Sequence, residues 1–168
     1  DQIWQWEIKD GRSSQAMFHL FRRLHALRQA GRIERVVTFQ PTQFTSPPSR
    51  AENEEIMARP IEQAGADGAT VLVLVGNVHA RLSAVSFGET YLPMAAHLPQ
   101  GATVTMDIAS MGGNTWACSG RPITCGPMPT RGDGEPSEVP QVRLGADYGP
   151  NYSGVLDLGR MITASDPQ

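Results

Sequence analysis

The most pronounced apolar run of the chain spans residues 70–75, TVLVLV, and it stops abruptly at Gly76, Asn77 and His79. The run does not alternate with polar residues, which is typical of a strand buried on both faces of a parallel sheet. We therefore predict a central strand here. Because open α/β sheets bind ligands beyond the carboxyl ends of their strands, the polar residues after the run are where we expect a functional site.

Apolar residues at helical spacing predict two helices before this run. The first would follow Ser13 or Ser14 as the N-cap and end at Gly31, a residue suited to the position just after a helix. The second would cover residues 51–64, with Pro60 expected to break or kink it.

Further elements complete an alternating order. Strands are predicted over residues 34–40 and 102–108, and a short helix over residues 91–98. The order α, β, α, β, α, β predicts an α/β fold with a mostly parallel sheet and flanking helices.

The character of the sequence changes after this. Residues 110–150 are rich in Gly and Pro and predict a long loop, which in a compact domain is usually functional or mobile. Residues 152–158 predict a last strand, antiparallel at the sheet edge in one interpretation. The length fits one domain over residues 1–168.

Composition excludes several classes of protein. Hydrophobic residues make up 40% of the chain and charged residues 18%, which indicates a folded domain rather than a disordered one. The net charge of −3 gives no indication of binding to nucleic acid or to an anionic membrane. No apolar run approaches the roughly 20 residues that span a bilayer.

The two cysteines, Cys118 and Cys125, lie in the Gly/Pro-rich segment. They favour a local disulfide, and with it a periplasmic or secreted protein; the alternative is two reduced thiols. The sequence supplies no zinc-binding pattern around them.

His79 is the first candidate for chemistry. An imidazole at a strand end can act as a general base or acid near neutral pH, or bind a divalent metal ion. Asn77 would orient this ring or donate to an oxyanion, and Arg81 would pair with a carboxylate or phosphate. The plainer interpretation is that His79 caps the strand end by bonding to the backbone.

Two further residues are candidates for binding. Asp107 ends a predicted strand and would face the same cleft as His79, or act as a turn cap. Arg12 precedes the first helix. The N-terminus of that helix would either bind an anion or be capped by a nearby side chain. The sequence has no P-loop, GxGxxG, GxSxG, HExxH or EF-hand pattern.

Four segments together resemble a known superfamily: residues 10–17, DGRSSQAM; 71–81, VLVLVGNVHAR; 103–118, with TVTMDIAS and GGNTWAC; and 154–165, GVLDLGRMITAS. They resemble the C-terminal half of secreted bacterial proteins that include erythromycin esterase, the haem-uptake protein ChaN and the Tiki proteases. In that comparison Gly76, Asn77 and His79 match the second of two histidine motifs. The resemblance implies that the first motif lies on an N-terminal half missing from this sequence.

The resemblance and the residues lead to three hypotheses. The first is a hydrolase-type site with His79 as base or metal ligand, acting on a small molecule or a peptide. The second is a non-catalytic protein that binds haem or another small ligand through His79, with Tyr91 or Met94 lining the pocket. The third is an interaction fragment whose Trp4 and Trp6 meet a second copy or the missing half.

Overall fold

The computed structural model describes residues 13–40 and 48–166, and the described chain forms two compact units. Unit 1 combines residues 13–36, 109–140 and 158–166, and unit 2 combines residues 37–40, 48–108 and 141–157. Arg12, Trp4 and Trp6 lie outside the described residues. No helix within the described ranges is long and apolar enough to cross a membrane.

Unit 1 begins with helix α1 (Gln15–Gln29), and local capping explains both of its ends. The hydroxyl of Ser14 accepts a hydrogen bond from the Met17 backbone N–H at 3.3 Å. Gly31 has a positive φ of 66°, and its N–H donates to the Arg28 carbonyl at 3.0 Å. The predicted helix and its glycine terminator are therefore confirmed.

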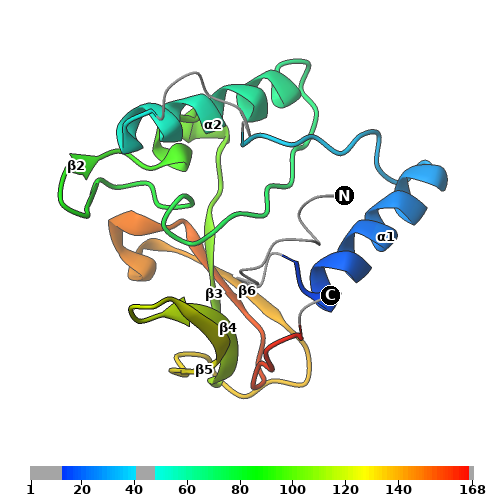
Figure 1. Cartoon of the computed structure of the whole chain (residues 1–168). Coiled ribbons are helices and arrows are strands. Elements are labelled where there is room, and N and C mark those ends of the chain that lie inside the picture. The colour runs from blue at the N-terminus through cyan, green and yellow to red at the C-terminus, as the bar shows by residue number, and fades with distance from the viewer. Residues whose placement is uncertain (1–12, 41–47, 167–168) are drawn as a thin grey trace. The chain divides into compact units, whose positions relative to one another are not determined.

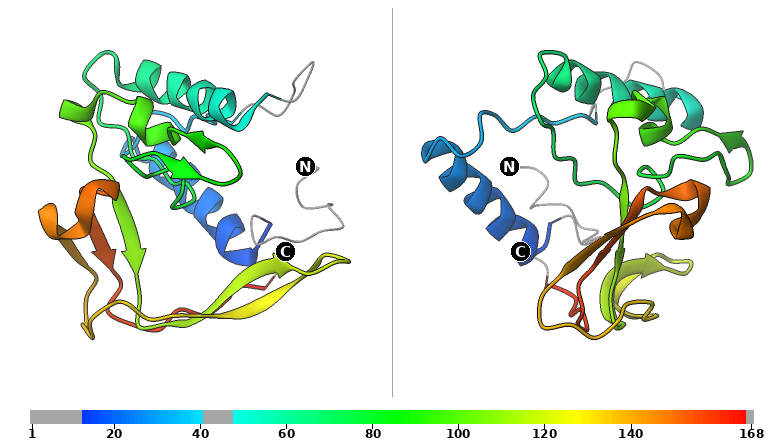
Figure 2. Two further views of the ribbon diagram at one scale, coloured as in Figure 1. Left: turned by 90° about the vertical axis from the view of Figure 1, so that its left-hand side faces the viewer. Right: turned by 180° about the vertical axis from the view of Figure 1, so that it is seen from behind.

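Most of the predicted 110–150 loop is not a loop. Strands β4 (Gly113–Ser119) and β5 (Thr124–Thr130) form an antiparallel hairpin in unit 1, visible as the long yellow-green ribbon in Figure 2. Cross-strand pairing over seven residues outweighs the low strand propensity of Gly and Pro, which misled the sequence-based prediction.

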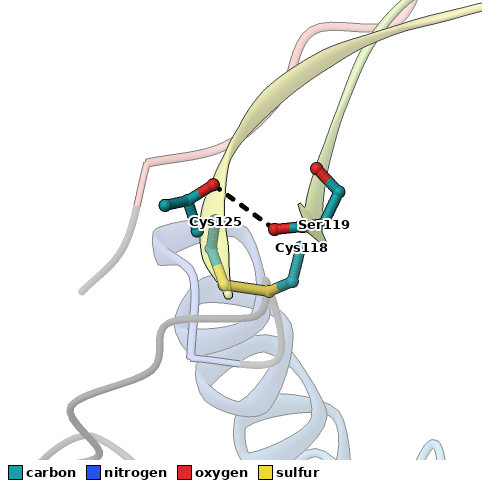
Figure 3. Close-up of a disulfide and its surroundings, with 4 residues drawn as sticks. Cys118, Ser119 and Cys125 are labelled. Atoms are coloured by element: carbon teal, nitrogen blue, oxygen red, sulfur yellow. Dashed lines mark hydrogen bonds between the residues drawn. A yellow bond between two sulfur atoms is a disulfide. The ribbon is translucent and has the colours of Figure 1, made fainter. Parts of the chain in front are cut away.

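The predicted disulfide is confirmed within this hairpin. Cys118 and Cys125 are directly paired across the two strands and their sulfur atoms are bonded (Figure 3). Beside them the Thr124 hydroxyl donates to the Ser119 carbonyl at 3.4 Å. The bridge therefore closes the end of the hairpin next to its turn.

Unit 2 contains helix α2 (Arg50–Gly65), which begins with a capping box. The Ser49 hydroxyl accepts from the Glu52 N–H at 3.2 Å, and the Glu52 carboxylate accepts from the Ser49 N–H at 2.8 Å. The helix continues through Pro60, so the predicted break is wrong. Buried neighbours on both sides of this proline, Met57 and Ile61, hold the helix against the core despite the missing donor.

The core of unit 2 lies between α2 and the 3₁₀-helix η2 (Met94–His97), the short green turn beside α2 in Figure 1. Met57, Ala58, Ile61 and Met94 are its buried members. Partly buried residues from preceding and following segments pack on it: Phe39, Val73, Val75 and Leu98. Only this short 3₁₀-helix replaces the helix predicted over residues 91–98.

A three-stranded sheet has the order β3 (Met106–Ala109), β7 (Gly154–Asp157), β6 (Gln141–Leu144). Strand β7 is antiparallel to β6, as the sequence indicated, but it lies in the centre of the sheet rather than at its edge. A small hairpin of β1 (Val85–Ser86) and β2 (Thr90–Tyr91) and the 3₁₀-helices η3 (Gln100–Ala102) and η4 (Ala146–Asn151) complete the elements.

The prediction of a mostly parallel α/β sheet with flanking helices is therefore wrong. The described strands form three small sheets. Among the described helices, α1 and α2 are longer than two turns. Residues 34–40 and 70–75 form no strand, and the strand predicted from residue 102 begins only at Met106. From Leu72 to Val75 the burial alternates: Leu72 is 93% exposed, whereas Val73 packs on the core. An extended segment with one buried face needs no sheet around it, which the sequence pattern alone could not reveal.

Candidate functional site

The candidate site is built around His79, which lies in a tight turn after the extended segment. The His79 N–H donates to the Gly76 carbonyl at 3.0 Å, and the next amide along, Ala80, donates to the Asn77 carbonyl at 3.2 Å. The His79 carbonyl accepts from the Ala95 N–H of η2 at 2.9 Å. The histidine backbone is thus held both by its own turn and by the 3₁₀-helix of the core.

Glu54, on α2, holds the imidazole ring. Nδ1 of His79 lies 2.8 Å from both carboxylate oxygens, Oε1 and Oε2. The Glu54 side chain is 4% exposed, whereas that of His79 is 35% exposed. A second donor, the Met94 N–H, bonds to Oε2 at 2.8 Å, so the buried carboxylate is fully engaged by the ring and the backbone.

This contact assigns the two ring nitrogens different roles. A carboxylate accepts hydrogen bonds, so Nδ1 of His79 carries the proton that bonds to Glu54. Nε2 has no hydrogen-bond partner in the described part of the chain. In the neutral ring Nε2 then carries the lone pair.

A second group of side chains clamps the other end of the turn. The Tyr152 hydroxyl donates to the Asn77 carbonyl at 3.0 Å. Burial raises the pKa of Tyr152 above 10.0, the nearby charge of Asp107 raises the same pKa further, and Arg81 lowers it. The phenol is therefore protonated throughout the neutral range and remains a donor to the turn.

Asn151 is the centre of this second group. Its side-chain oxygen accepts from Nη2 of Arg81 at 2.7 Å and from the hydroxyl of Ser83. Its backbone carbonyl accepts from the Leu82 N–H at 2.8 Å. The segment from residue 77 to residue 83 is consequently held at several points. Glu54 and η2 hold it through His79, Tyr152 holds its first residue, and Asn151 holds its last three residues.

The structure brings some of the predicted site residues together. His79 and Arg81 lie on the same clamped turn. Asn77 is exposed and contributes its backbone carbonyl to that turn. Glu54 holds the ring, and within the described part of the chain the Asn77 side chain forms no hydrogen bond with it. Asp107 accepts from its neighbouring Ile108 N–H at 3.0 Å and acts on Tyr152 through its charge. 

Four residues of the site escaped the sequence analysis: Glu54, Ser83, Asn151 and Tyr152. A signal for the first was present, because Glu54 precedes Met57, Ala58 and Ile61 by three, four and seven residues and thus shares their helical face. A carboxylate in an apolar stripe requires a buried partner. The other three follow the Gly/Pro-rich segment, or the turn itself, without any distinguishing pattern.

The residues present do not fit the cofactors considered. In the described part of the chain, no group of three or more His, Cys, Asp or Glu side chains could hold a metal ion. For haem, the expected pocket residues Tyr91 and Met94 are 8% and 2% exposed and therefore present almost no surface to a ligand.

The site therefore consists of an anchored glutamate–histidine pair with a clamped arginine two residues along the chain. The sequence matches no protein-family model, and comparison with curated proteins and with solved structures gave no significant match.

Proposed function

We infer that this chain is a hydrolase in which His79 acts as a general base on water, with Glu54 as its positioning partner. The observation that carries the proposal is the contact of Nδ1 with both oxygens of a buried carboxylate at 2.8 Å. This contact leaves Nε2 as the basic nitrogen of a ring whose side chain is 35% exposed. General-base catalysis of this kind contributes about 10²- to 10⁴-fold to a rate.

In the proposed reaction, a water oxygen adds to the carbonyl carbon of an ester while Nε2 of His79 takes one proton from that water. Glu54 stabilises the imidazolium that forms. The tetrahedral intermediate then collapses with cleavage of the bond between the carbonyl carbon and the alkoxy oxygen. The imidazolium returns its proton to the leaving oxygen, so the products are an acid and an alcohol and His79 ends neutral.

The exposed side chain of Asn77 stands on the same turn as His79 and is proposed as the donor to the developing oxyanion. A small-molecule or peptide substrate is proposed, in keeping with the resemblance to the superfamily of erythromycin esterase, ChaN and the Tiki proteases. The Cys118–Cys125 disulfide supports a periplasmic or secreted location.

The test measures hydrolysis of 4-nitrophenyl acetate by the full 168-residue chain, by His79→Ala and by the control His25→Ala. His25 is an exposed histidine on α1, so its loss controls for non-specific imidazole catalysis. We expect kcat/KM to fall about 100-fold or more in His79→Ala and to be unchanged in His25→Ala. Equal turnover by a folded His79→Ala variant, or no turnover above the imidazole background by the original chain, would overturn the proposal.

A further inference from the structure

Two arginines of unit 2 have a buried Nε without a hydrogen-bond partner, Arg81 and Arg143. They differ in what neutralises their charge. Nη2 of Arg143 lies 2.7 Å from Oδ2 of Asp157, a carboxylate that is 3% exposed. Nη2 of Arg81 instead meets the neutral amide oxygen of Asn151. Arg143 has a counter-ion in the fold, and Arg81 forms no ion pair within the described part of the chain.

The acceptor that Arg81 does have is shared. The Asn151 side-chain oxygen also accepts from the Ser83 hydroxyl, so two donors engage one uncharged oxygen. Asp107 stands close enough to act on Tyr152 by its charge, but it accepts from its own neighbouring amide and does not pair with Arg81. The fold thus fixes the position of the guanidinium without a counter-ion, and Nη1, which is not buried and forms no hydrogen bond in the described part of the chain, remains an unused donor.

A partly buried guanidinium without a counter-ion can bind an anion, because its positive charge is not neutralised within the fold. A charged acceptor forms a stronger hydrogen bond with a guanidinium N–H than a neutral amide oxygen does. The planar guanidinium suits carboxylate and phosphate oxygens better than it suits an amide. Arg81 follows His79 by two residues on one clamped turn, so both residues belong to the same fixed backbone segment.

We propose that Arg81 binds an anionic group of the substrate, a carboxylate or a phosphate monoester, so that the site acts on anionic esters. This specificity rests on the proposed function of His79, but the binding of the anion itself does not. Asn151 and Ser83 are positioning residues that fix the guanidinium. Esters that carry an acid group are thereby bound at the site in preference to neutral esters.

Binding is tested first, without turnover. The Nε–H signal of Arg81, assigned by its loss in Arg81→Gln, is followed by NMR in the full chain while inorganic phosphate or succinate is added. We expect a saturable shift of this signal with at least one of the two anions, and the tighter one identifies the class of acid group. The signal of Arg143, which already has its carboxylate, is the internal control and should not move.

Two variants sharpen the result. Asn151→Asp is isosteric and supplies Arg81 with an internal carboxylate, so it should weaken anion binding about 10- to 100-fold while Arg81 itself is retained. Arg59→Gln removes one positive charge at a 65% exposed position and should leave binding unchanged. Unchanged affinity in Asn151→Asp, equal losses in Arg59→Gln and Arg81→Gln, or no shift with either anion would overturn the proposal.

The link to hydrolysis is tested with two esters, 4-nitrophenyl acetate and mono-4-nitrophenyl succinate. In Arg81→Gln the KM for the succinate ester should rise about 10- to 100-fold more than the KM for the acetate ester. Repeating the titration with His79→Asn separates the two proposals. In His79→Asn the saturable shift should persist, because binding of the anion does not need the base. In the original chain, a saturable shift without hydrolysis of either ester refutes the role of His79 alone, whereas hydrolysis without any shift or charge preference refutes the role of Arg81 alone.

Discussion

Replacing Glu54 with glutamine tests the central contact of the site at constant shape. Glutamine keeps one acceptor oxygen but turns the second carboxylate oxygen into an amide NH₂. Two donors currently point at this carboxylate, Nδ1–H of His79 and the Met94 N–H. In Glu54→Gln, one of them must face a donor, and the charge that stabilises the imidazolium is gone.

The magnitude follows from the bonds that change. A hydrogen bond to a charged group contributes about 1.5–3 kcal/mol, and each 1.36 kcal/mol is a factor of ten in rate. We therefore expect kcat/KM to fall roughly 10- to 150-fold. The stability loss should not exceed about 3 kcal/mol, the upper cost of one unsatisfied buried donor, because a neutral amide is also easier to bury than a carboxylate.

The assay compares ester hydrolysis and urea unfolding of Glu54→Gln with those of Glu55→Gln. Glu55 is the next residue of α2, but its side chain is 53% exposed and paired with Arg59, so this control removes the same charge from the surface. A folded Glu54→Gln variant whose kcat/KM stays within twofold of the original would refute the positioning role. So would an equal loss of activity in Glu55→Gln, since that would indicate a general effect of charge on the helix.

Three other predictions concern the frame around the site. Ser49→Ala removes the capping box of the helix that carries Glu54 and should lower the free energy of unfolding in urea by about 1 kcal/mol. Replacing Cys118 and Cys125 with serine opens a loop of eight residues and should cost about 2–3 kcal/mol in unit 1, while ester hydrolysis at the site in unit 2 persists. Burial raises the pKa of Tyr152 from 10.0, so the folded state holds the phenolic proton more tightly than the unfolded state. The resulting stability is present below pH 10 and is lost as the pH rises through the folded-state pKa. Tyr152→Phe should therefore lack this alkaline loss of stability in unfolding titrations.

The sequence predicted those elements whose signals are local. Helix α1 is bounded by Ser14 and Gly31, and each of these residues acts through hydrogen bonds within a few positions of itself. The same holds for the Ser49 capping box of α2 and for the disulfide, whose cysteines are separated by one short turn. Such signals do not depend on the rest of the fold, so they could be interpreted without it.

Strands depend on distant partners, and there the sequence misled. Residues 70–75 have the composition of a buried strand, yet Leu74 is 61% exposed and the segment joins no sheet. Conversely, Gly and Pro made residues 110–150 resemble a loop, although the register of β4 with β5 and of β6 with β7 orders much of this segment. Propensity cannot decide between these outcomes, because the pairing energy comes from residues elsewhere in the chain.

The sequence and the structure both make His79 the centre of the candidate site, but the structure gives a different reason for it. His79 is held by α2 and η2 rather than by the end of a sheet strand, because Met94 both packs in the core and donates its N–H to Glu54. The packing that stabilises unit 2 therefore also sets the position of the proposed base. A core substitution that shifts η2 should consequently misplace the carboxylate and the imidazole together. The apolar stripe of α2 with Glu54 within it, rather than the apolar run before Gly76, was the stronger sequence signal for this site.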